Sequence, residues 1–331
     1  MKQLLFFLRR QIFILLIALF LIPSIGSAAE IEIENESETT GLGCKFTIVW
    51  LSDTQEYAST YPDIYNSMMD YIGKVREERN IVYVIHTGDQ INDAYKGEDI
   101  QRANDAFLLL PDDLPVFTAC GNHDYKKSYD NKGDYSIDYS PYLDNRKDTG
   151  ILTEAEYLDG LDHYVEFSEG GMNFLLLTIA YKREKESIDW ATQVCKEHPD
   201  SNVILVVHSF LSSSRYYTSS GEILHSSLLK ASPNIRLVLC GHMHNAARLE
   251  EAFDDNDDGI PDRSVWELLY NYQGIGMGGK GFLRFLTIDP VSGDMAVETY
   301  SPWLDKYNYR ERNDSFVLPG LFESRNNNEQ S

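Results

Sequence analysis

Five short runs of apolar and β-branched residues stand out along the chain, and each ends in polar residues. The runs are FTIVWLSDTQ (46–55), IVYVIHTGD (81–89), LPVFTACGNHD (114–124), NVILVVHS (202–209) and IRLVLCGHMH (235–244). Continuous apolar runs of this length are typical of strands that are buried on both faces of a sheet. The pattern therefore predicts five buried strands that deliver polar side chains at their ends.

Helical patterns lie between several of these predicted strands. Residues 62–79 begin with a proline and carry apolar residues at helical spacing, and residues 98–110 and 186–197 also have a helical pattern. Strands that alternate with helices predict a layered α/β fold. Sites in such folds gather beyond the carboxyl ends of the strands, so we expect the five strands to build one site there.

Two other segments differ in pattern from these strands and helices. Residues 125–166 combine tyrosines with many charges, which predicts an inserted loop region covering the site rather than a core element. From Trp266 onward the pattern predicts strands joined by glycine turns, with a hairpin at residues 289–293. Residues 319–331 are polar, and we predict a disordered tail there.

The first residues have the layout of a signal peptide. Lys2, Arg9 and Arg10 precede an apolar run over residues 12–22, Pro23 breaks that run, and small residues follow at 26–29. This predicts a leader over residues 1–29 that is removed on export, leaving a secreted or periplasmic protein with no stable membrane span. The alternative is a permanent anchor, but the run is shorter than the roughly 20 residues that a spanning helix needs. Residues 30–44 predict an acidic, flexible spacer.

The charge balance is strongly acidic, with 52 Asp and Glu against 29 Lys and Arg and a net charge of −23. A field of that sign repels polyanions, which argues against a non-specific nucleic-acid binder. It also suits the solubility of an exported protein. The four cysteines, Cys44, Cys120, Cys195 and Cys240, show no CxxC pairing, which excludes a zinc knuckle. Their disulfide state and the oligomeric state are left open by the sequence.

The polar residues at the strand ends are candidate metal ligands. Asp53 and Gln55 alternate, as do His242 and His244, so each pair can point to one side of an extended chain. The cluster of Asn122, His123 and Asp124 combines residue types that rarely occur together without chemistry. Asp89 and His208 complete the set. Each of these residues, taken singly, could instead have a structural role as a helix cap, a loop residue or a core histidine.

The motifs D-x-Q, GD-x-x-N, GNHD, a strand-end His and GH-x-H occur in this order, each after an apolar run. This order resembles the calcineurin-like metallophosphoesterases, which carry D-x-H, GD-x-x, GNH-D/E, H and GH-x-H. The resemblance covers roughly residues 45–300. It implies a two-sheet α/β sandwich flanked by helices, with the metal site at the carboxyl ends of the strands. We place this domain at residues 45–318.

The resemblance also implies two metal ions that share one carboxylate. The first would be held by Asp53, Gln55, Asp89 and His244, and the second by Asp89, Asn122, His208 and His242. Carboxylate and imidazole ligands suit manganese, iron or zinc. Two such ions can lower the pKa of a bound water from 15.7 to about 7, which supplies hydroxide for attack on phosphorus.

His123 resembles the catalytic histidine of the family, which would contact the phosphate and protonate the departing alkoxide. Asp124 would then orient the His123 ring and raise its basicity. The alternative for Asp124 is a capping role.

The chain departs from the family pattern at two positions. Gln55 replaces the usual histidine with an amide oxygen, which affects the identity and affinity of the first metal. Asn92 stands where the purple acid phosphatases have a metal-binding tyrosine, which argues against a coloured acid phosphatase. We expect Asn92 to brace a loop. We likewise interpret Gln273 as structural, although its segment resembles a secreted branch of the family.

The acidic segment DDNDDGIPD (254–262) resembles an extracellular calcium loop, with alternating oxygen-bearing residues, a glycine and a final Asp. It lacks the bidentate Glu that ends an EF-hand loop. The sequence favours an acidic hairpin tip slightly over a calcium site.

Together these features predict metal-dependent hydrolysis of a small phosphomonoester or phosphodiester outside the cytoplasm. The alternatives are a nuclease-like phosphodiesterase, which the acidic charge disfavours, and a non-catalytic, metal-stabilised surface protein, which His123 argues against. We expect the leaving group to be recognised by the tyrosine-rich insertion and by Arg215, Tyr216 and Tyr217, although these tyrosines could equally pack as a lid. The sequence does not distinguish monoester from diester substrates.

Overall fold

The computed structural model describes residues 43–124, 155–157, 160–182 and 184–323. Contacts divide the chain into residues 1–40 and residues 41–331, and all described residues belong to the second unit. The predicted signal peptide, nearly all of the predicted spacer and most of the tyrosine-rich insertion lie outside the described residues. No helix in the described part of the chain is long and apolar enough to cross a membrane.

The first sheet has the strand order β13-β12-β11-β1-β2-β3, and β14 also pairs with β12. Strands β1, β2 and β3 are parallel, whereas β11 runs antiparallel to β1. The strands are β1 (Phe46–Leu51), β2 (Ile81–His86), β3 (Val116–Thr118), β11 (Leu283–Ile288), β12 (Met295–Ser301), β13 (Lys306–Tyr307) and β14 (Ser315–Leu318).

The second sheet has the strand order β4-β5-β6-β7-β8-β10-β9, with β6, β7, β8 and β10 parallel. The strands are β4 (Ala155–Tyr157), β5 (Asp162–Glu169), β6 (Met172–Ile179), β7 (Asn202–Val207), β8 (Ile235–Cys240), β9 (Asn245–Phe253) and β10 (Arg263–Asn271). The central strands of both sheets are therefore parallel and their carboxyl ends lie at one edge of each sheet, as the five apolar runs predicted.

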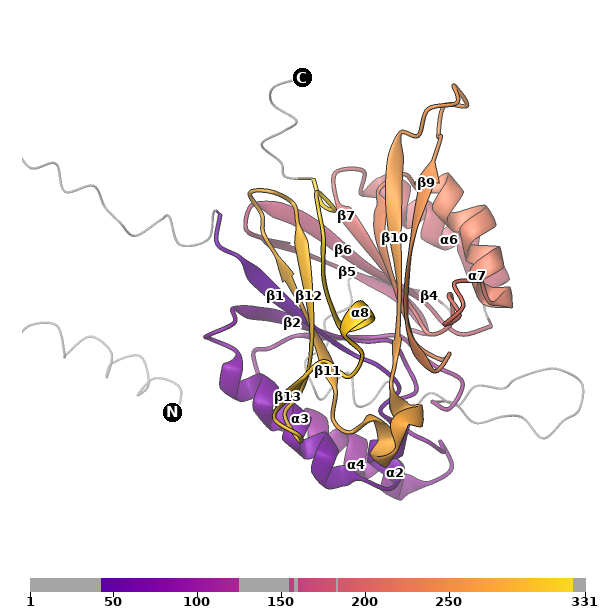
Figure 1. Ribbon diagram of the computed structural model, residues 1–331. Coiled ribbons are helices and arrows are strands. Elements are labelled where there is room, and N and C mark those ends of the chain that lie inside the picture. The colour runs from indigo at the N-terminus through magenta and orange to yellow at the C-terminus, as the bar shows by residue number, and fades with distance from the viewer. Residues whose placement is uncertain (1–42, 125–154, 158–159, 183, 324–331) are drawn as a thin grey trace, which may run out of the picture. The chain divides into compact units, whose positions relative to one another are not determined.

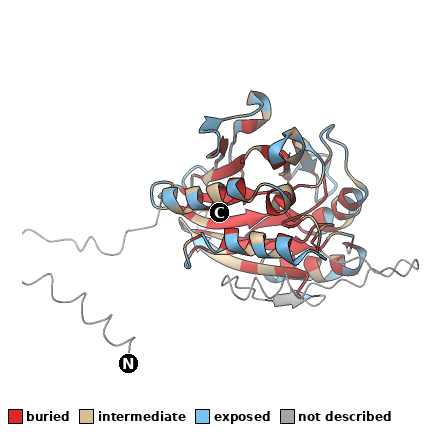
Figure 2. Ribbon diagram, turned by 90° about the horizontal axis from the view of Figure 1, so that it is seen from below, coloured by how far each residue is buried: buried red, intermediate tan, exposed pale blue. Residues whose placement is uncertain are grey.

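Alternating side chains of each central strand face two different cores. Ile48 and Trp50 of β1 join the core between the sheets, whereas Val49 and Leu51 pack under the helices. Two helical layers cover the outer faces of the sheets, with their exposed sides turned outward (Figures 1 and 2). Helices α2 (Gln55–Ser59), α3 (Pro62–Val75) and α4 (Gly97–Phe107) cover the first sheet, and α6 (Glu184–Glu197), α7 (Ser219–Leu224) and η1 (His225–Leu229) cover the second.

Short helices complete the fold, η2 (Gln273–Ile275) and η3 (Met277–Gly279) before β11 and α8 (Glu311–Asp314) before β14. The two-sheet α/β sandwich flanked by helices is thus confirmed, and the predicted helices are present with shifted ends. The first ends at Val75 rather than at residue 79, because Arg76 to Asn80 form a turn in which the Ile81 N–H donates to the Arg76 carbonyl at 2.9 Å.

Two predictions about segment type are wrong in part. Residues 155–157 and 162–166 are not an inserted loop, because they belong to β4 and β5, β5 pairs with β6 over seven residue pairs, and Val165 lies in the core between the sheets. Residues 319–323 are not a disordered tail, because Leu321 and Phe322 are buried and the Phe322 N–H donates to the Gly293 carbonyl at 3.0 Å. The packed domain therefore extends to Glu323.

The hairpin predicted at residues 289–293 joins β11 to β12. The Gly293 N–H donates to the Asp289 carbonyl at 2.8 Å, and Gly293 has a φ of +73°. A Cβ atom there would collide with the carbonyl oxygen of Phe322, so both the backbone angle and the close approach require glycine.

Candidate metal centre

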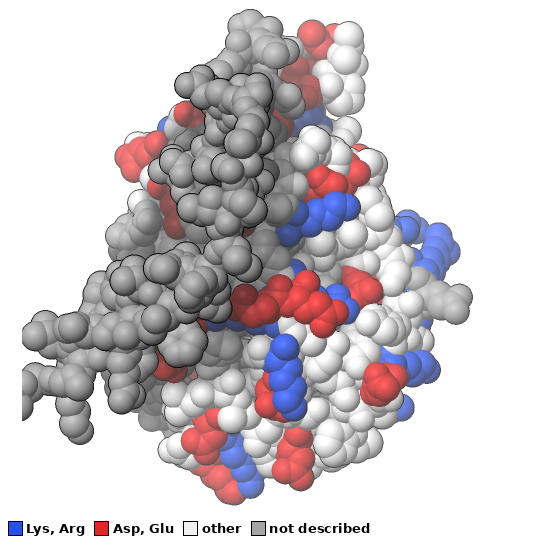
Figure 3. Space-filling view, turned by 90° about the vertical axis from the view of Figure 1, so that its left-hand side faces the viewer, with Lys and Arg blue, Asp and Glu red and all other residues white. Residues whose placement is uncertain are grey.

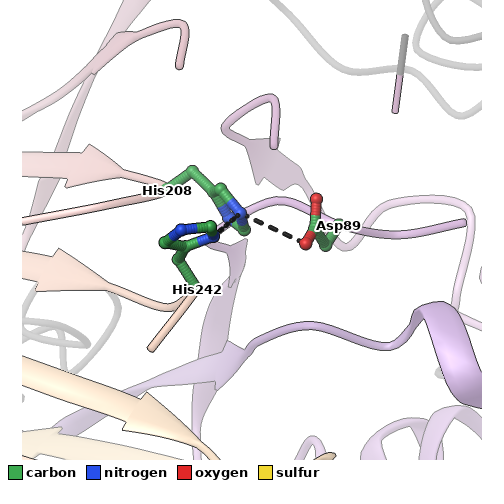
Figure 4. Close-up of side chains that lie close together, drawn as sticks. All are labelled: Asp89, His208 and His242. Carbon is green, nitrogen blue, oxygen red and sulfur yellow. Dashed lines mark hydrogen bonds and ion pairs between the residues drawn. The ribbon is translucent and has the colours of Figure 1, made fainter. Parts of the chain in front are cut away.

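Three ligand-type side chains converge beyond the ends of β2, β7 and β8. His208 Nε2 lies 3.2 Å from Asp89 Oδ2 and 3.2 Å from His242 Nδ1 (Figure 4). One atom from each of the three residues lies within 4.8 Å of the others, which is a spacing that one ion can bridge. These residues lie 34 to 153 positions apart in sequence, and the parallel strands bring them together.

Asn122 joins this group from the loop after β3, with its Oδ1 3.0 Å from His208 Nε2. The four residues that the resemblance assigns to the second metal, Asp89, Asn122, His208 and His242, therefore lie together. His208 Nδ1 lies 2.9 Å from the Thr87 carbonyl oxygen. Because a carbonyl only accepts, Nδ1 donates its proton there, and Nε2 is the ring atom that faces Asp89, Asn122 and His242.

Asp53 lies against the same group. The backbone N–H of His242 donates to Asp53 Oδ1 at 3.1 Å, and Ser52 Oγ donates to Asp53 Oδ2. A Cβ atom at position 241 would collide with Asp53 Oδ2, so the glycine of the GHMH motif permits this close approach. Gln273 also reaches the site, with Nε2 3.5 Å from Asp53 Oδ1.

Gln55 is the first residue of α2, and its side-chain oxygen provides the test of whether a metal fits here. The residue is 6% exposed, and its Oε1 has no hydrogen-bond partner among the residues that the structure describes. A buried acceptor without a partner costs about 1–3 kcal/mol, so such atoms in native proteins usually contact a bound water, ion or ligand. A cation bound by Asp53 and Gln55 would satisfy this oxygen.

His244 is placed differently from the other predicted ligands. Its side chain is exposed, and no hydrogen bond or ion pair joins it to another predicted ligand in the described part of the chain. Its Nδ1 lies 2.8 Å from where a Cβ atom would stand at Gly274, so the ring packs against the backbone of η2. Its role as a ligand of the first metal stays a prediction.

Three of the clustered residues have left-handed backbone angles. The φ values are 49° for Asp53, 56° for Asp89 and 64° for His242. This conformation is uncommon outside glycine, and it persists where the surrounding structure holds it, often at functional sites. These angles indicate that contacts within the site, rather than the backbone preferences of the individual residues, set the conformation of these loops.

The charges of the carboxylates and imidazoles in the site shift one another's pKa values. Burial raises the pKa of Asp53 to about 7, opposed by the positive charge of His208 and reinforced by Asp89. Burial disfavours a charged His208, but the charges of Asp89 and Asp53 outweigh it and raise its pKa to about 9. The buried site thus attracts positive charge, which is the property a cation centre requires.

His123 lies beside this group and is half-buried. Its backbone N–H donates to Asp89 Oδ1 at 2.8 Å, and its Nδ1 lies 2.7 Å from the Asn92 carbonyl oxygen. The carbonyl accepts from Nδ1, which fixes the ring so that Nε2 is the atom available to a substrate. Asn92 therefore braces His123 through its backbone, in agreement with the predicted bracing role.

Asp124 does not orient the His123 ring, which corrects that part of the prediction. Its carboxylate accepts four backbone N–H groups, at 2.7–3.3 Å, from Asp89, Gln90, Ile91 and Gly121. The alternative capping role is the one observed, and it ties the loop after β2 to the GNHD loop. Burial and the charge of Asp89 raise the pKa of Asp124 to about 6.

Sequence reasoning missed two residues that support the site. His86, at the end of β2, is fully buried, with Nε2 2.9 Å from Thr54 Oγ1 and Nδ1 accepting the Gly88 N–H at 3.1 Å. It connects the loops that carry Asp53 and Asp89. Tyr181, after β6, lies against the His208 and His242 rings. Neither belongs to a motif; the only signal was that each follows an apolar run.

The acidic segment 254–262 forms the tip of the β9–β10 hairpin, as the sequence favoured. The carboxylates accept backbone N–H groups within the loop, for example Gly259 to Asp254 Oδ2 at 2.7 Å and Asp255 to Asp262 Oδ2 at 2.7 Å. These contacts explain the acidic residues without an ion, and calcium binding there stays a prediction.

The family model described as calcineurin-like phosphoesterase matches residues 46–246, so the chain belongs to this family of phosphoester hydrolases. The uncharacterized protein YvnB of Bacillus subtilis (strain 168) is 34% identical over 265 residues, which cover 80% of this chain and 20% of that protein. The chain thus spans about a fifth of the length of this relative.

Among solved structures, the fold is similar to that of the purple acid phosphatase PPD1 from yellow lupin (Lupinus luteus) seeds. The TM-score is 0.58 at 15% sequence identity, over 86% of this chain and 56% of the other. At this identity the likeness shows the fold alone, which is the two-sheet sandwich described above.

Proposed function

We propose that this chain hydrolyses small phosphate esters with the help of two divalent metal ions, outside the cytoplasm. The observation that carries the proposal is the convergence of Asp89, Asn122, His208 and His242 at adjoining strand ends. His123 stands beside them. Membership of a phosphoester hydrolase family supports the reaction class.

The donor set suits two adjoining ions that share Asp89. Asp53 and Gln55 would hold one ion with Asp89 and His244, and Asn122, His208 and His242 would hold the other. Mixed carboxylate, amide and imidazole donors fit manganese, iron or zinc. When bound, such a pair supplies Lewis acidity and a water of lowered pKa.

The protein side chains position the reacting groups. Asp89, anchored through the Asp124 cap, fixes the GNHD loop by accepting the His123 N–H at 2.8 Å. The Asn92 carbonyl accepts from Nδ1 of His123, so a protonated His123 presents its second N–H at Nε2. We assign this proton to the departing alkoxide oxygen, which makes His123 the general acid.

Two alternative functions have less support from the observations. A nuclease-like phosphodiesterase would favour a basic surface, whereas the net charge is −23 and the described part of the face in Figure 3 intersperses single basic side chains with acidic ones. A non-catalytic, metal-stabilised surface protein would not need a braced His123. The leader-like layout of residues 1–29 is what supports the location outside the cytoplasm.

The experiment compares hydrolysis of p-nitrophenyl phosphate and bis(p-nitrophenyl) phosphate by the full chain without its leader. Protein treated with a chelator should be inactive, and added manganese should restore turnover. His208→Ala should remove activity under all conditions, while His198→Ala on the second sheet's outer side should not. Full turnover by protein shown to be free of metal would reject the proposal.

A further inference from the structure

A tyrosine and a lysine follow β6 and border the metal centre. The Tyr181 ring contacts two metal-site imidazoles, with ring centroids 5.5 Å from His208 and 5.2 Å from His242. Lys182 comes next in sequence, and its side chain is exposed. The cationic side chain of Lys182 therefore follows directly after the aromatic residue that contacts the proposed phosphate site.

The backbone of this segment is held in an uncommon conformation. Lys182 has a φ of 61°, in the left-handed region that non-glycine residues rarely adopt. Its N–H donates to Glu184 Oε1 at 3.0 Å, and Glu184 is only 6% exposed. The Tyr181 N–H points to the Cys120 carbonyl at 3.4 Å, which links the segment to the GNHD loop. Residues in such conformations are found frequently at functional sites.

The ammonium of Lys182 lies over the Tyr181 ring, with Nζ 5.3 Å from the ring centroid. The buried carboxylate of Glu184 accepts the Lys182 backbone N–H. No ion pair with Lys182 occurs among the residues that the structure describes. A cation–π contact at an exposed position is worth only about 0.5–1 kcal/mol, so the ammonium is free to turn toward an anion.

We propose that Lys182, positioned by Tyr181, binds a non-bridging phosphoryl oxygen of the substrate and gives the enzyme a preference for phosphate monoesters. This inference rests on the proposed function. A monoester carries up to two negative charges at neutral pH and a diester carries one. The carboxylates of Asp53 and Asp89 repel both, and a mobile cation at the border of the site offsets that repulsion more for the dianion.

The test uses the manganese-loaded full chain without its leader, and inorganic phosphate is the probe. Binding is measured by isothermal titration calorimetry for the parent, Lys182→Gln and Lys182→Arg. Because one charge-assisted hydrogen bond is removed, Lys182→Gln should bind phosphate about tenfold more weakly. Lys182→Arg should restore most of the affinity. Lys185→Gln removes the same charge from an exposed position in the first turn of α6, and it should bind like the parent.

Kinetics with the two nitrophenyl esters measure the preference for the monoester over the diester. Lys182→Gln should lose about tenfold in kcat/KM on the monoester and less than about threefold on the diester. Equal phosphate affinity of the parent and Lys182→Gln, an equal loss in Lys185→Gln, or equal losses on both esters would overturn the inference. If the parent hydrolyses neither ester, the proposed function fails, and the phosphate affinities still decide whether Lys182 binds the anion.

Discussion

His123 Nδ1 lies 2.7 Å from the backbone carbonyl oxygen of Asn92, so the orientation of the proposed general acid is set by the backbone of a neighbouring loop. That loop is itself held by the Asp124 carboxylate through the N–H groups of Gln90 and Ile91. The position of the acid therefore depends on a chain of contacts that starts from a buried carboxylate and ends at Nε2 of His123.

We expect His123→Ala to lower kcat by about 10²- to 10⁴-fold on alkyl phosphates, because a departing alkoxide needs a proton. The loss should be smaller on nitrophenyl phosphate, whose leaving group is a weak base. Metal content should be unchanged, since the hydrogen bond of His123 to Asp89 comes from its backbone N–H, which alanine keeps. A loss of the same size on both kinds of ester would contradict the general-acid role and leave His123 as a phosphate-binding group.

Asp124→Asn should destabilise the fold by about 2–4 kcal/mol. An asparagine offers one acceptor oxygen and adds an NH₂ donor where the carboxylate accepts four backbone N–H groups. Denaturant unfolding of metal-free protein measures the change. Asp112→Asn makes the same substitution at an exposed position and should shift stability by less than about 0.5 kcal/mol. If the two variants are equally stable, the cap contributes little.

Glu267, on β10, predicts a specific pH dependence of stability. It is fully buried, Tyr217 donates to its Oε1 at 3.2 Å, and its Oε2 has no hydrogen-bond partner within the described ranges. Burial, with Glu251 nearby, raises its pKa to about 8 from an ordinary 4.5. The folded state therefore holds a proton that the unfolded state releases near pH 4.5, so this residue's contribution to stability falls as pH rises from about 4.5 to 8.

Glu267→Gln replaces this carboxyl group with a neutral amide and should remove that contribution. The stability of the variant relative to the parent should be higher at pH 8.5 than at pH 5 by at least about 1 kcal/mol. Glu250→Gln, at an exposed position on the adjacent β9, serves as the control and should show no such difference. A Glu267→Gln difference that is flat with pH would mean that Glu267 is ionised in the folded protein.

The sequence predicted those parts of the fold and site that depend on patterns along the chain. Runs such as 202–209 are apolar on both faces because Val203 packs under helices and Ile204 between the sheets, which is a pattern that a parallel central strand requires. Since parallel strands end at one edge, residues following those runs had to meet. Asp89, His208 and His242 did so.

The parts that the sequence did not predict depend on choices between nearby partners. Whether the Asp124 carboxylate faces the His123 ring or four backbone N–H groups is decided by the paths of two loops, which no spacing rule encodes. The strand β5 was missed because it has no continuous apolar run and its surroundings are rich in tyrosine and charge. Lys182 belongs to no motif, and only its φ and its place beside Tyr181 reveal it.

The buried Oε1 of Gln55 has no hydrogen-bond partner in the described part of the chain. A neutral amide oxygen is a harder and weaker donor than imidazole, so the first site should hold its ion less tightly than the second and prefer manganese or magnesium to zinc. Gln55→His should therefore raise the metal content per chain after dialysis and shift the preference toward zinc or iron, as measured by mass spectrometry. Gln193→His, at an exposed position on α6, controls for an added histidine. If Gln55→His and the parent retain the same metals equally well, Gln55 is not a ligand, and the first site rests on Asp53, Asp89 and His244.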